Sequence, residues 1–304
     1  MIRHYEFRNK RLLETVSAGD VLVAINPESG EKQYLLEEYE LDEHTLLSSL
    51  DPNELSRLEI EGDHNALILK VPKNYSAEDD YEFKVFSIGL FLFKKSLIII
   101  MSEENNLFDP KLTAKINSPN DLLLKIIYGI IFHFLRHLKV ISMITEELEE
   151  KISKAMENKY LLCLFTLEKS LVYYLNAINT NSVLIEKIRH NASRLHLGAD
   201  DLELLDEIII ENTQCFKQAE IYSNILASMM DARASIVNNN LNVLMKRLNI
   251  ITISLMVPTL VVSVFSMNVK IPMQNFPWAF AVIISISLLA MSLFLSLWKF
   301  FNKS

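Results

Sequence analysis

The strongest hydrophobic pattern in this chain lies at its C-terminal end. From Leu248 to Trp298 the only charged side chain is Lys270, which separates two charge-free runs. Each run is long enough to cross the hydrocarbon core of a membrane, which takes about 20 apolar residues. The stretch between the runs contains two prolines, which end helices. The pattern therefore predicts a membrane hairpin, with helices at 248–267 and 278–298 and a loop at 268–277, rather than two core helices of a soluble protein.

Basic residues flank this hairpin on one side of the predicted membrane. Lys246 and Arg247 precede the first span, and Lys299 and Lys303 follow the second. Because cytoplasmic flanks carry the excess of lysine and arginine, both termini are expected in the cytoplasm. The sequence thus predicts a multi-pass protein of the cell membrane with a short cytosolic tail at 299–304.

One face of the first span carries mostly small or polar side chains at alternating steps of four and three residues. They are Asn238, Asn242, Met245, Asn249, Thr252, Met256, Thr259, Ser263 and Ser266. Such steps keep one face of a helix in register. Because lipid does not favour a polar stripe, this face is expected against protein or water. Two helices enclose no pore, so a pore requires several copies around an axis; otherwise the stripe serves to hold helices together.

Short motifs in the first span and its loop resemble the CorA family of divalent-cation transporters. They are Met245-Lys-Arg-Leu-Asn-Ile-Ile-Thr252, Pro258-Thr259, Ser266-Met267-Asn268 and Phe276-Pro277-Trp278. The resemblance implies a homopentamer in which the first membrane helix lines the pore and the second surrounds it. It also implies a selectivity filter at Ser266, Met267 and Asn268, and a pore lined by Asn242, Met245, Asn249, Thr252, Met256, Thr259 and Ser263.

Two departures from the family pattern bear on the transported ion. Ser266 replaces the glycine of the family's Gly-Met-Asn, and the loop carries Lys270 where the family usually has acidic residues. Magnesium gives up its water reluctantly, so it suits a ring of neutral oxygens and is the expected ion. Zinc or cobalt transport on the same scaffold is an alternative. A non-conducting, membrane-anchored sensor is an alternative of another class.

The preceding residues predict an α+β cytosolic part. Residues 1–117 have the pattern of an α/β domain, with strands at Ile2–Phe7, Val21–Ile25, Ala66–Val71, Phe83–Phe93 and Ser96–Met101 and short helices at Asp42–Leu50 and Pro52–Leu58. Residues 118–198 predict a helical hairpin, Asp121–Asn158 and Tyr160–Leu197, closed by Gly198. Residues 199–247 contain no Gly or Pro and predict a stalk helix that runs into the first span.

Charge is divided unevenly along the chain. Three of the 30 basic residues and none of the 38 acidic residues lie in 248–304, so residues 1–247 carry a formal net charge of −11. This balance argues against nucleic acid as a partner and is compatible with cations. In the family, intracellular magnesium bridges acidic residues of neighbouring subunits and closes the pore. The candidate acids are Asp79, Asp80, Asp200, Asp201, Glu203, Asp206 and Glu207; the acids near residue 200 also suit a helix N-terminus without any metal.

The remaining candidates for chemistry are few. The sequence shows no nucleophile–base pair, phosphate loop or cofactor fingerprint, so neither an enzyme nor a prosthetic group is expected. Cys163 and Cys215 lack metal or redox spacing and are expected to be free thiols. His133 and His137 are four residues apart on a predicted helix and could clamp zinc. No carboxylate follows on that face, however, which favours an interior pair.

Overall fold

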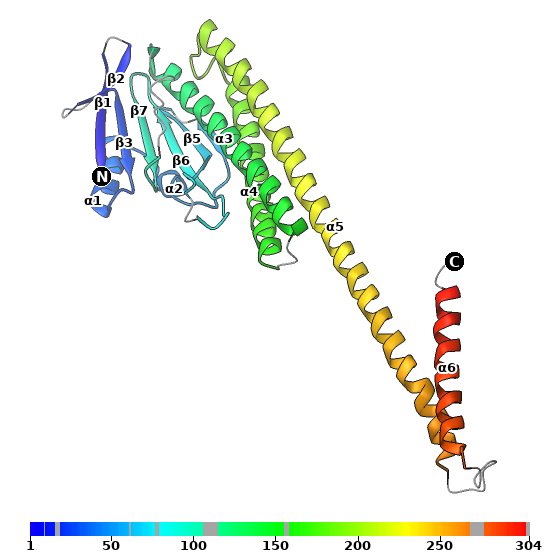
Figure 1. Cartoon of the computed structure of the whole chain (residues 1–304). Helices are drawn as coiled ribbons and strands as arrows, with labels where there is room; N and C mark the ends of the chain where they lie inside the picture. Colours follow the sequence, from blue (N-terminus) through cyan, green and yellow to red (C-terminus); the bar gives the residue numbers. More distant parts are fainter. Residues whose placement is uncertain are drawn as a thin grey trace. The chain divides into compact units, whose positions relative to one another are not determined.

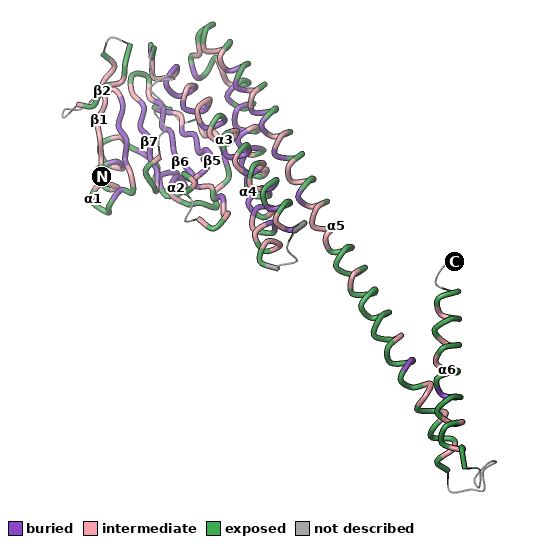
Figure 2. The backbone as a smooth tube through the Cα atoms, in the orientation of Figure 1, coloured by how far each residue is buried: buried purple, intermediate pink, exposed green. Residues whose placement is uncertain are grey.

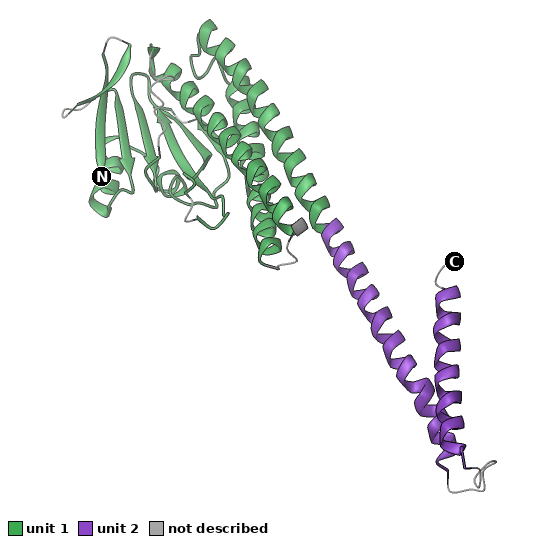
Figure 3. Cartoon of the chain, viewed as in Figure 1, with its two compact units in different colours: residues 1–230 green, residues 231–304 purple. Residues whose placement is uncertain are grey.

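The computed structural model describes residues 1–8, 10–15, 19–60, 62–76, 79–105, 115–154, 158–267 and 277–301. It divides into two compact units, Met1–Met230 and Asp231–Ser304 (Figure 3). Asn268 and Lys270, on which two of the sequence-based expectations depend, lie outside the described residues.

The first unit is built on a seven-stranded sheet with the order β2-β1-β3-β7-β6-β5-β4. The strands are β1 (Ile2–Arg8), β2 (Arg11–Thr15), β3 (Val21–Ile25), β4 (Arg57–Ile60), β5 (Asn65–Pro72), β6 (Val85–Leu92) and β7 (Leu97–Met101). Neighbouring strands are antiparallel except for β3 and β7, which are parallel. The predicted β6–β7 hairpin is confirmed, and it lies near the middle of the sheet as expected.

Helices cover both faces of this sheet (Figure 1). The helices α1 (Ser29–Glu38) and α2 (Glu43–Ser48) cover one face, and α3 (Pro119–Lys154) and α4 (Asn158–His190) cover the other. The strands serve both layers because their side chains alternate between faces. In β3, for example, Val21 and Val23 belong to the larger core with α3 and α4, whereas Leu22 and Ala24 belong to the smaller core with α1 and α2.

One buried asparagine holds α4 against the edge of β5. β4 pairs only with Asn65–Ile68, so the backbone of Lys70 has no strand on that side. The Asn181 carboxamide fills the position: its Oδ1 accepts from the Lys70 N–H at 2.9 Å, and its Nδ2 donates to the Lys70 carbonyl at 2.8 Å. The Ser56 hydroxyl also donates to Asn181 Oδ1, at 2.7 Å. Because a buried backbone group without a partner is costly, this amide fixes the helical layer on the sheet.

The long helix α5 (Ala199–Phe265) contributes to both units, and α6 (Ala279–Phe301) belongs to the second. Along its first half, α5 buries one side against α3 and α4, through Leu205, Ile208, Cys215, Ala219 and Leu226. Figure 2 shows this change along the helix, from a partly buried segment to an exposed one. The helix does not end at Pro258, which lies inside it.

Several sequence-based expectations about the first unit are wrong. Residues 52–58 are not a helix: Asp51 accepts a hydrogen bond from the Asn53 N–H in a turn, and β4 begins at Arg57. Strands β2 and β4 and helix α1 were not predicted. Gly198 does not close α4, which ends at His190; the positive φ near this point belongs to His196, at 53°. Gly198 instead donates its N–H to Asp201 Oδ2, at 2.9 Å, at the start of α5.

Candidate ion pathway

The second unit is a hairpin of two apolar helices. Four helices of the described chain are long and apolar enough to cross a membrane, and burial separates them into two kinds. The most apolar windows of α3 and α4 are 44% and 39% buried, because these helices pack in the first unit, whereas those of α5 and α6 are only 6% buried. The two windows that remain uncovered belong to α5 and α6, the helices that contain the two predicted spans.

Within this hairpin, α5 turns one side towards α6. Ser254 is 8% exposed and Ser287 of α6 is 5% exposed, and these two small residues are the only buried ones in the described part of the second unit. Small residues allow two helices to pack closely. Lys246 Nζ lies 5.9 Å from the centre of the Trp298 ring, which places the start of the first span beside the end of the second. Ile250 and Val261 lie on the same side of α5 as Ser254 and are half-buried.

The polar stripe lies on the opposite side of α5. Met245 and Ser263 are each nine residues from Ser254, which is about two and a half helical turns and therefore half a turn away around the axis. The stripe residues within the predicted span and just before it are all exposed in the single chain: Asn242, Met245, Asn249, Thr252, Met256, Thr259 and Ser263. Since α6 occupies the other side, the stripe is the face of α5 that remains available to other copies or to water.

Hydroxyl groups on this face are oriented by the helix itself. Thr252 Oγ1 donates to the Leu248 carbonyl at 2.9 Å, and Thr259 Oγ1 donates to the Leu255 carbonyl at 2.7 Å. Each hydroxyl hydrogen is thus used within the helix, while the oxygen keeps lone pairs that accept from water. A hydrated cation presents water hydrogens outward, so these oxygens can hold its hydration shell.

The C-terminal end of α5 shows what the serine of the predicted filter does. The helix ends at Phe265, and the Ser266 N–H donates to the Ser263 carbonyl at 3.1 Å. Ser266 Oγ donates back to the Val262 carbonyl at 3.0 Å. Ser266 is not among the described residues with a positive φ. Its backbone therefore does not need the conformational freedom that glycine provides, and serine fits this position without strain. Met267, the next residue of the predicted filter, is 58% exposed.

The candidate regulatory acids mostly have local partners. At the start of α5, Asp201 accepts a hydrogen bond from the Gly198 N–H, and Asp206 forms an ion pair with Arg189 at 2.7 Å. Glu207 accepts a hydrogen bond from the Tyr128 hydroxyl at 2.9 Å. In the other group, hydrogen bonds from the Ser76 N–H and hydroxyl lower the pKa of Asp79. Asp80 has a positive φ of 45°. Asp200 and Glu203 are exposed.

These two groups lie at opposite ends of the helical layer. Tyr81, beside Asp80, interacts electrostatically with Lys151, as does Tyr160 near the start of α4. Arg189, the partner of Asp206, lies near the end of α4. From Tyr160 to Arg189 the helix rises about 40 Å, so one chain cannot bring the two groups to one ion. Consistent with this, no cluster of three or more His, Cys, Asp or Glu side chains in the described part of the chain could hold a metal.

The histidine pair forms a buried hydrogen-bonded chain between α3 and α4. His133 Nε2 and His137 Nε2 are 3.1 Å apart, and His137 Nδ1 is 2.7 Å from the Tyr174 hydroxyl. Burial lowers the pKa of His133 to about 3, and the neighbouring His137 adds to this shift. Burial also lowers the pKa of His137 to about 4, and the positive charge of Arg136 acts in the same direction. Cys215 of α5 and Tyr174 also interact, and burial raises both of their pKa values. The pair is therefore neutral and interior, as the sequence favoured.

This neutral pair predicts a loss of stability in acid. The unfolded histidines have a pKa near 6.5, so below that pH the unfolded chain binds protons that the folded chain does not. The free energy of unfolding keeps its full value above about pH 6.5 and decreases as the pH falls towards 4. The decrease is about 1 kcal/mol per histidine at pH 5.5. Thermal melting of the full-length protein between pH 8 and 5 measures this effect.

Matched variants separate the pair from other titrating groups. The double variant His133→Gln/His137→Gln is expected to melt with a weaker pH dependence than the wild type. Replacement of the exposed His190 by Gln is expected to leave the dependence unchanged. Equal pH dependence in the wild type and the double variant would contradict the assignment.

Comparison with known proteins agrees with this geometry. Residues 22–302 match the family described as CorA-like Mg2+ transporter protein, and the chain belongs to this family. The cobalt/magnesium transport protein CorA of Methanocaldococcus jannaschii is 23% identical over 82% of this chain and 80% of its own length. The complete structure of the CorA magnesium transporter from the same organism superimposes with a TM-score of 0.84, at 21% identity, over 98% of this chain and 97% of that one.

A second solved structure matches a smaller share of this chain. The cytoplasmic domain of ZntB from Vibrio parahaemolyticus matches with a TM-score of 0.61 at 16% identity, over 78% of this chain and 98% of that domain. At such identities, the likeness concerns the fold. The predicted α+β N-terminal part, long helix and C-terminal hairpin are thus confirmed as the CorA architecture.

Proposed function

We propose that this chain forms a homopentameric channel that carries Mg2+ across the cell membrane, with α5 of each copy lining the pore. Divalent-cation transport is the function of the family to which the chain belongs. The observation that carries the proposal is the position of the polar stripe, which lies on the side of α5 opposite Ser254 and α6. Several copies arranged with this side inward would form a wall of Asn, Thr, Ser and Met side chains.

The middle of α5 supports assembly from several copies. Between Asp231 and Asn249 nearly every side chain is exposed in the single chain. Many of these are large and apolar: Ile236, Val237, Leu241, Val243, Leu244, Met245 and Leu248 are each at least 41% exposed. A helix that is apolar on several sides needs other protein around it, and further copies of α5 supply it. Native mass spectrometry of the detergent-solubilised protein is expected to give five chains.

Magnesium is the proposed ion because the described stripe offers neutral oxygens and no carboxylate. Mg2+ keeps its water, which such oxygens can accept without trapping the ion. The curated relative is a cobalt/magnesium transporter, which agrees with this class of ion. Flux into proteoliposomes, measured separately with Mg2+, Co2+ and Zn2+, tests the proposal. Transport of Zn2+ alone would assign another ion to the scaffold, and no flux of any of the three would favour a non-conducting sensor.

The direction of insertion follows from the flanking charges. Basic residues stand at the two outer ends of the hairpin: Lys246 and Arg247 precede the first predicted span, and Lys299 and Lys303 follow the second. The loop between the spans carries only Lys270. We therefore place both termini in the cytoplasm and the loop outside. Labelling of a single cysteine at Lys270 by an impermeant reagent in intact cells would place the loop outside, and labelling only after lysis would reverse the topology.

Lys270 is expected to slow the entry of cations. One positive charge per copy near the proposed outer mouth repels an approaching dication, and this repulsion is screened by salt. Lys270→Glu should raise the initial rate of Mg2+ uptake, by about tenfold at low ionic strength and less at 0.15 M salt. Lys270→Gln should give an intermediate rate. A rate that is independent of the residue at 270 at low salt would place this lysine away from the ion path.

Intracellular Mg2+ is proposed to bind between subunits at the acidic groups, in a regulatory role. Because one chain cannot bring both groups to one ion, such a site needs a neighbouring copy. Mg2+ at about ten times its dissociation constant should raise the free energy of unfolding of the assembled protein by about 1.4 kcal/mol. Limited proteolysis and thermal melting of the full-length oligomer at increasing Mg2+ measure this protection.

The variants for this test spare the helix cap. Asp200→Asn/Glu203→Gln removes two exposed acids but keeps Asp201, which binds the Gly198 N–H. This variant should lose part of the protection by Mg2+. Glu186→Gln, at an exposed position of α4, should retain all of it. Full protection in both variants would show that the start of α5 holds no regulatory ion.

A further inference from the structure

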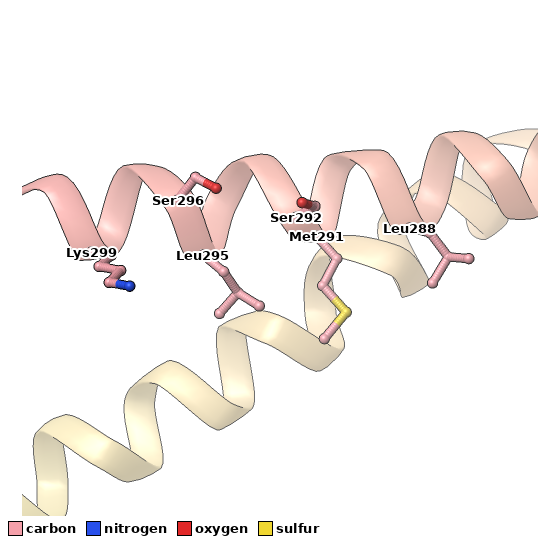
Figure 4. A pocket seen from close by; sticks show the side chains of 6 residues that line it. All are labelled: Leu288, Met291, Ser292, Leu295, Ser296 and Lys299. Atoms are coloured by element: carbon pink, nitrogen blue, oxygen red, sulfur yellow. The ribbon is translucent and has the colours of Figure 1, made fainter.

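The described chain carries a polar pocket in its first unit and an apolar groove in its second. The groove runs along α6, where Leu288, Met291 and Leu295 point to the same side of the helix (Figure 4). Such a surface suits lipid or another helix of a membrane protein. The pocket has a volume of about 350 Å³, and ligand pockets commonly measure about 300–1,000 Å³. Unlike the groove, the pocket brings together charged, amide and aromatic side chains from distant parts of the chain.

Two turns at one end of the sheet form one wall of this pocket. Asp63 lies in the turn between β4 and β5, and Lys94 lies in the turn between β6 and β7. The two turns are neighbours because Asn65, at the start of β5, pairs with Leu92, at the end of β6. The register of the sheet therefore places an acidic and a basic side chain at the same pocket.

The connection between α4 and α5 forms another wall. Leu195 is 3% exposed and packs in the larger core, while the residues on either side of it, Arg194 and His196, are exposed and line the pocket. Asn120 of α3 fixes this connection, since its Nδ2 donates to the carbonyls of Leu195, at 3.2 Å, and His196, at 3.4 Å. His196 has a φ of 53°, which is unfavourable for a residue with a Cβ atom. Strained backbone of this kind is concentrated at functional sites, and here the core and Asn120 maintain it.

Two cations at this pocket are available to an anion. Arg194 and Lys94 form no ion pair within the described part of the chain. They form a locally basic site on an acidic part of the protein, because residues 1–247 carry a formal net charge of −11. A guanidinium group binds phosphate through two parallel hydrogen bonds, and a lysine adds a point charge. The charges of the pocket therefore favour a molecule that carries a phosphate group.

The rest of the lining suits an organic molecule better than a bare anion. Phe93 is half-buried, and its ring stacks with that of His64 at a centroid distance of 4.9 Å. Aromatic side chains of this kind form surfaces on which planar rings stack. The Asp63 carboxylate repels a free anion but accepts from hydroxyl and amino groups. Asn120 uses its Nδ2 on the backbone, so its Oδ1 offers a second acceptor at the same pocket.

We propose that this pocket binds a nucleotide, with the phosphate held by Arg194 and Lys94 and the base lying against Phe93. The hydroxyl and amino groups of the nucleotide donate to Asp63 and Asn120. An acidic segment of a neighbouring copy is a poorer occupant, because it would bring a carboxylate close to that of Asp63. The inference goes beyond ion transport: it concerns the first unit alone and holds whether or not the pore conducts.

Binding of two nucleoside monophosphates to the full-length protein tests the proposal. AMP and UMP are suitable probes, since they bind Mg2+ less strongly than nucleoside triphosphates do. Isothermal titration calorimetry of the detergent-solubilised oligomer is expected to show one site per chain for at least one of them. Adenosine, uridine, ribose 5-phosphate and inorganic phosphate are expected to bind at least about tenfold more weakly, because each lacks either the phosphate or the base and the hydrogen bonds that go with it.

Charge-matched variants locate the site. Lys94→Gln and Arg194→Gln are each expected to weaken binding of the nucleotide about tenfold, which corresponds to the loss of one hydrogen bond between charged groups. Lys95→Gln removes the same charge from the next residue, which is exposed but does not line the pocket, and is expected to leave the affinity nearly unchanged. Phe93→Leu should weaken binding of the nucleotide but not of ribose 5-phosphate, because only the nucleotide carries a base.

Other occupants give different results. If ribose 5-phosphate or inorganic phosphate binds as tightly as the nucleotides, the pocket is a simple anion site and the proposal is overturned. An equal loss of affinity in Lys94→Gln and Lys95→Gln would place the nucleotide elsewhere and would also overturn it. Absence of binding of both AMP and UMP would have the same consequence, because the pocket would then be covered by a neighbouring chain or shaped for another ligand.

Discussion

Asn268→Ala is expected to reduce Mg2+ flux at least about tenfold, or to remove its selectivity. The resemblance to the CorA family implies that Asn268 belongs to the selectivity filter, and we propose that its carboxamide oxygen, one per copy, accepts hydrogen bonds from the water of the hydrated ion. Each such bond is worth about 0.5–1.5 kcal/mol. Removing one acceptor from every copy therefore weakens capture of the ion by more than one such interaction. Flux into proteoliposomes with Mg2+ and Na+ gradients measures both rate and selectivity.

Two neighbouring substitutions serve as controls for this loss. Asn275→Ala changes the same residue type later in the same loop and is expected to retain transport. Ser266→Gly is also expected to be tolerated, because the described Ser266 has no positive φ and uses its hydroxyl to bond the Val262 carbonyl. If Asn268→Ala conducts Mg2+ with unchanged rate and selectivity, the filter lies elsewhere or the chain is not a channel.

Cysteines on the stripe of α5 are expected to react with charged, water-soluble thiol reagents and to block flux once modified. Met256, Thr259 and Ser263 are suitable positions, since all three are exposed and lie opposite the α6 side. A charged reagent must pass through water to reach them if they line a pore. Reaching a position that faces lipid or protein costs about 2.5–3.5 kcal/mol for the charge, which slows labelling about a hundredfold.

The labelling experiment needs a protein from which the native cysteines have been removed. It also needs control positions on the other side of α5. Cys163 and Cys215 are the only cysteines of the chain, and both are free. Ile250→Cys and Val261→Cys place the thiol on the half-buried side near Ser254 and should react slowly without loss of flux. Equal labelling of both sets would remove the argument that the stripe lines a pore.

The sequence alone was sufficient for features that depend on local composition. A membrane offers no hydrogen bonds to the backbone, so a spanning segment must be a long apolar helix, and this requirement can be read directly from 248–298. The stripe is equally local, because the helical period fixes which residues share a face. The central strands β3, β6 and β7 were found for a similar reason: runs of Val, Ile, Leu and Phe that are buried on both faces have few other structures available.

Tertiary contacts decided the features that the sequence misjudged. β4 consists of the short run Arg57–Ile60, and it is a strand because β5 pairs with it, not because of its own propensity. The Asp51-Pro52 segment has the signals of a helix start, yet Arg57 forms ion pairs with Glu54 and Glu59 across the turn into β4. Near the end of α4, the positive φ falls on His196 instead of Gly198, and Asn120 Nδ2 donates to the carbonyls of Leu195 and His196 there.

For the candidate site, too, some features followed from the sequence and others only from the structure. The sequence determined which residues form the stripe, because helical period and residue polarity are local properties. Only the structure decided that α6 packs on the Ser254 side of α5 and leaves the stripe uncovered, since the packing side depends on which surfaces of two helices fit together. Likewise, the four-residue spacing of His133 and His137 could not show whether they bind a metal or each other. The burial of both rings and the Tyr174 hydroxyl at 2.7 Å make them a neutral hydrogen-bonded pair, because burial disfavours the charged form of histidine.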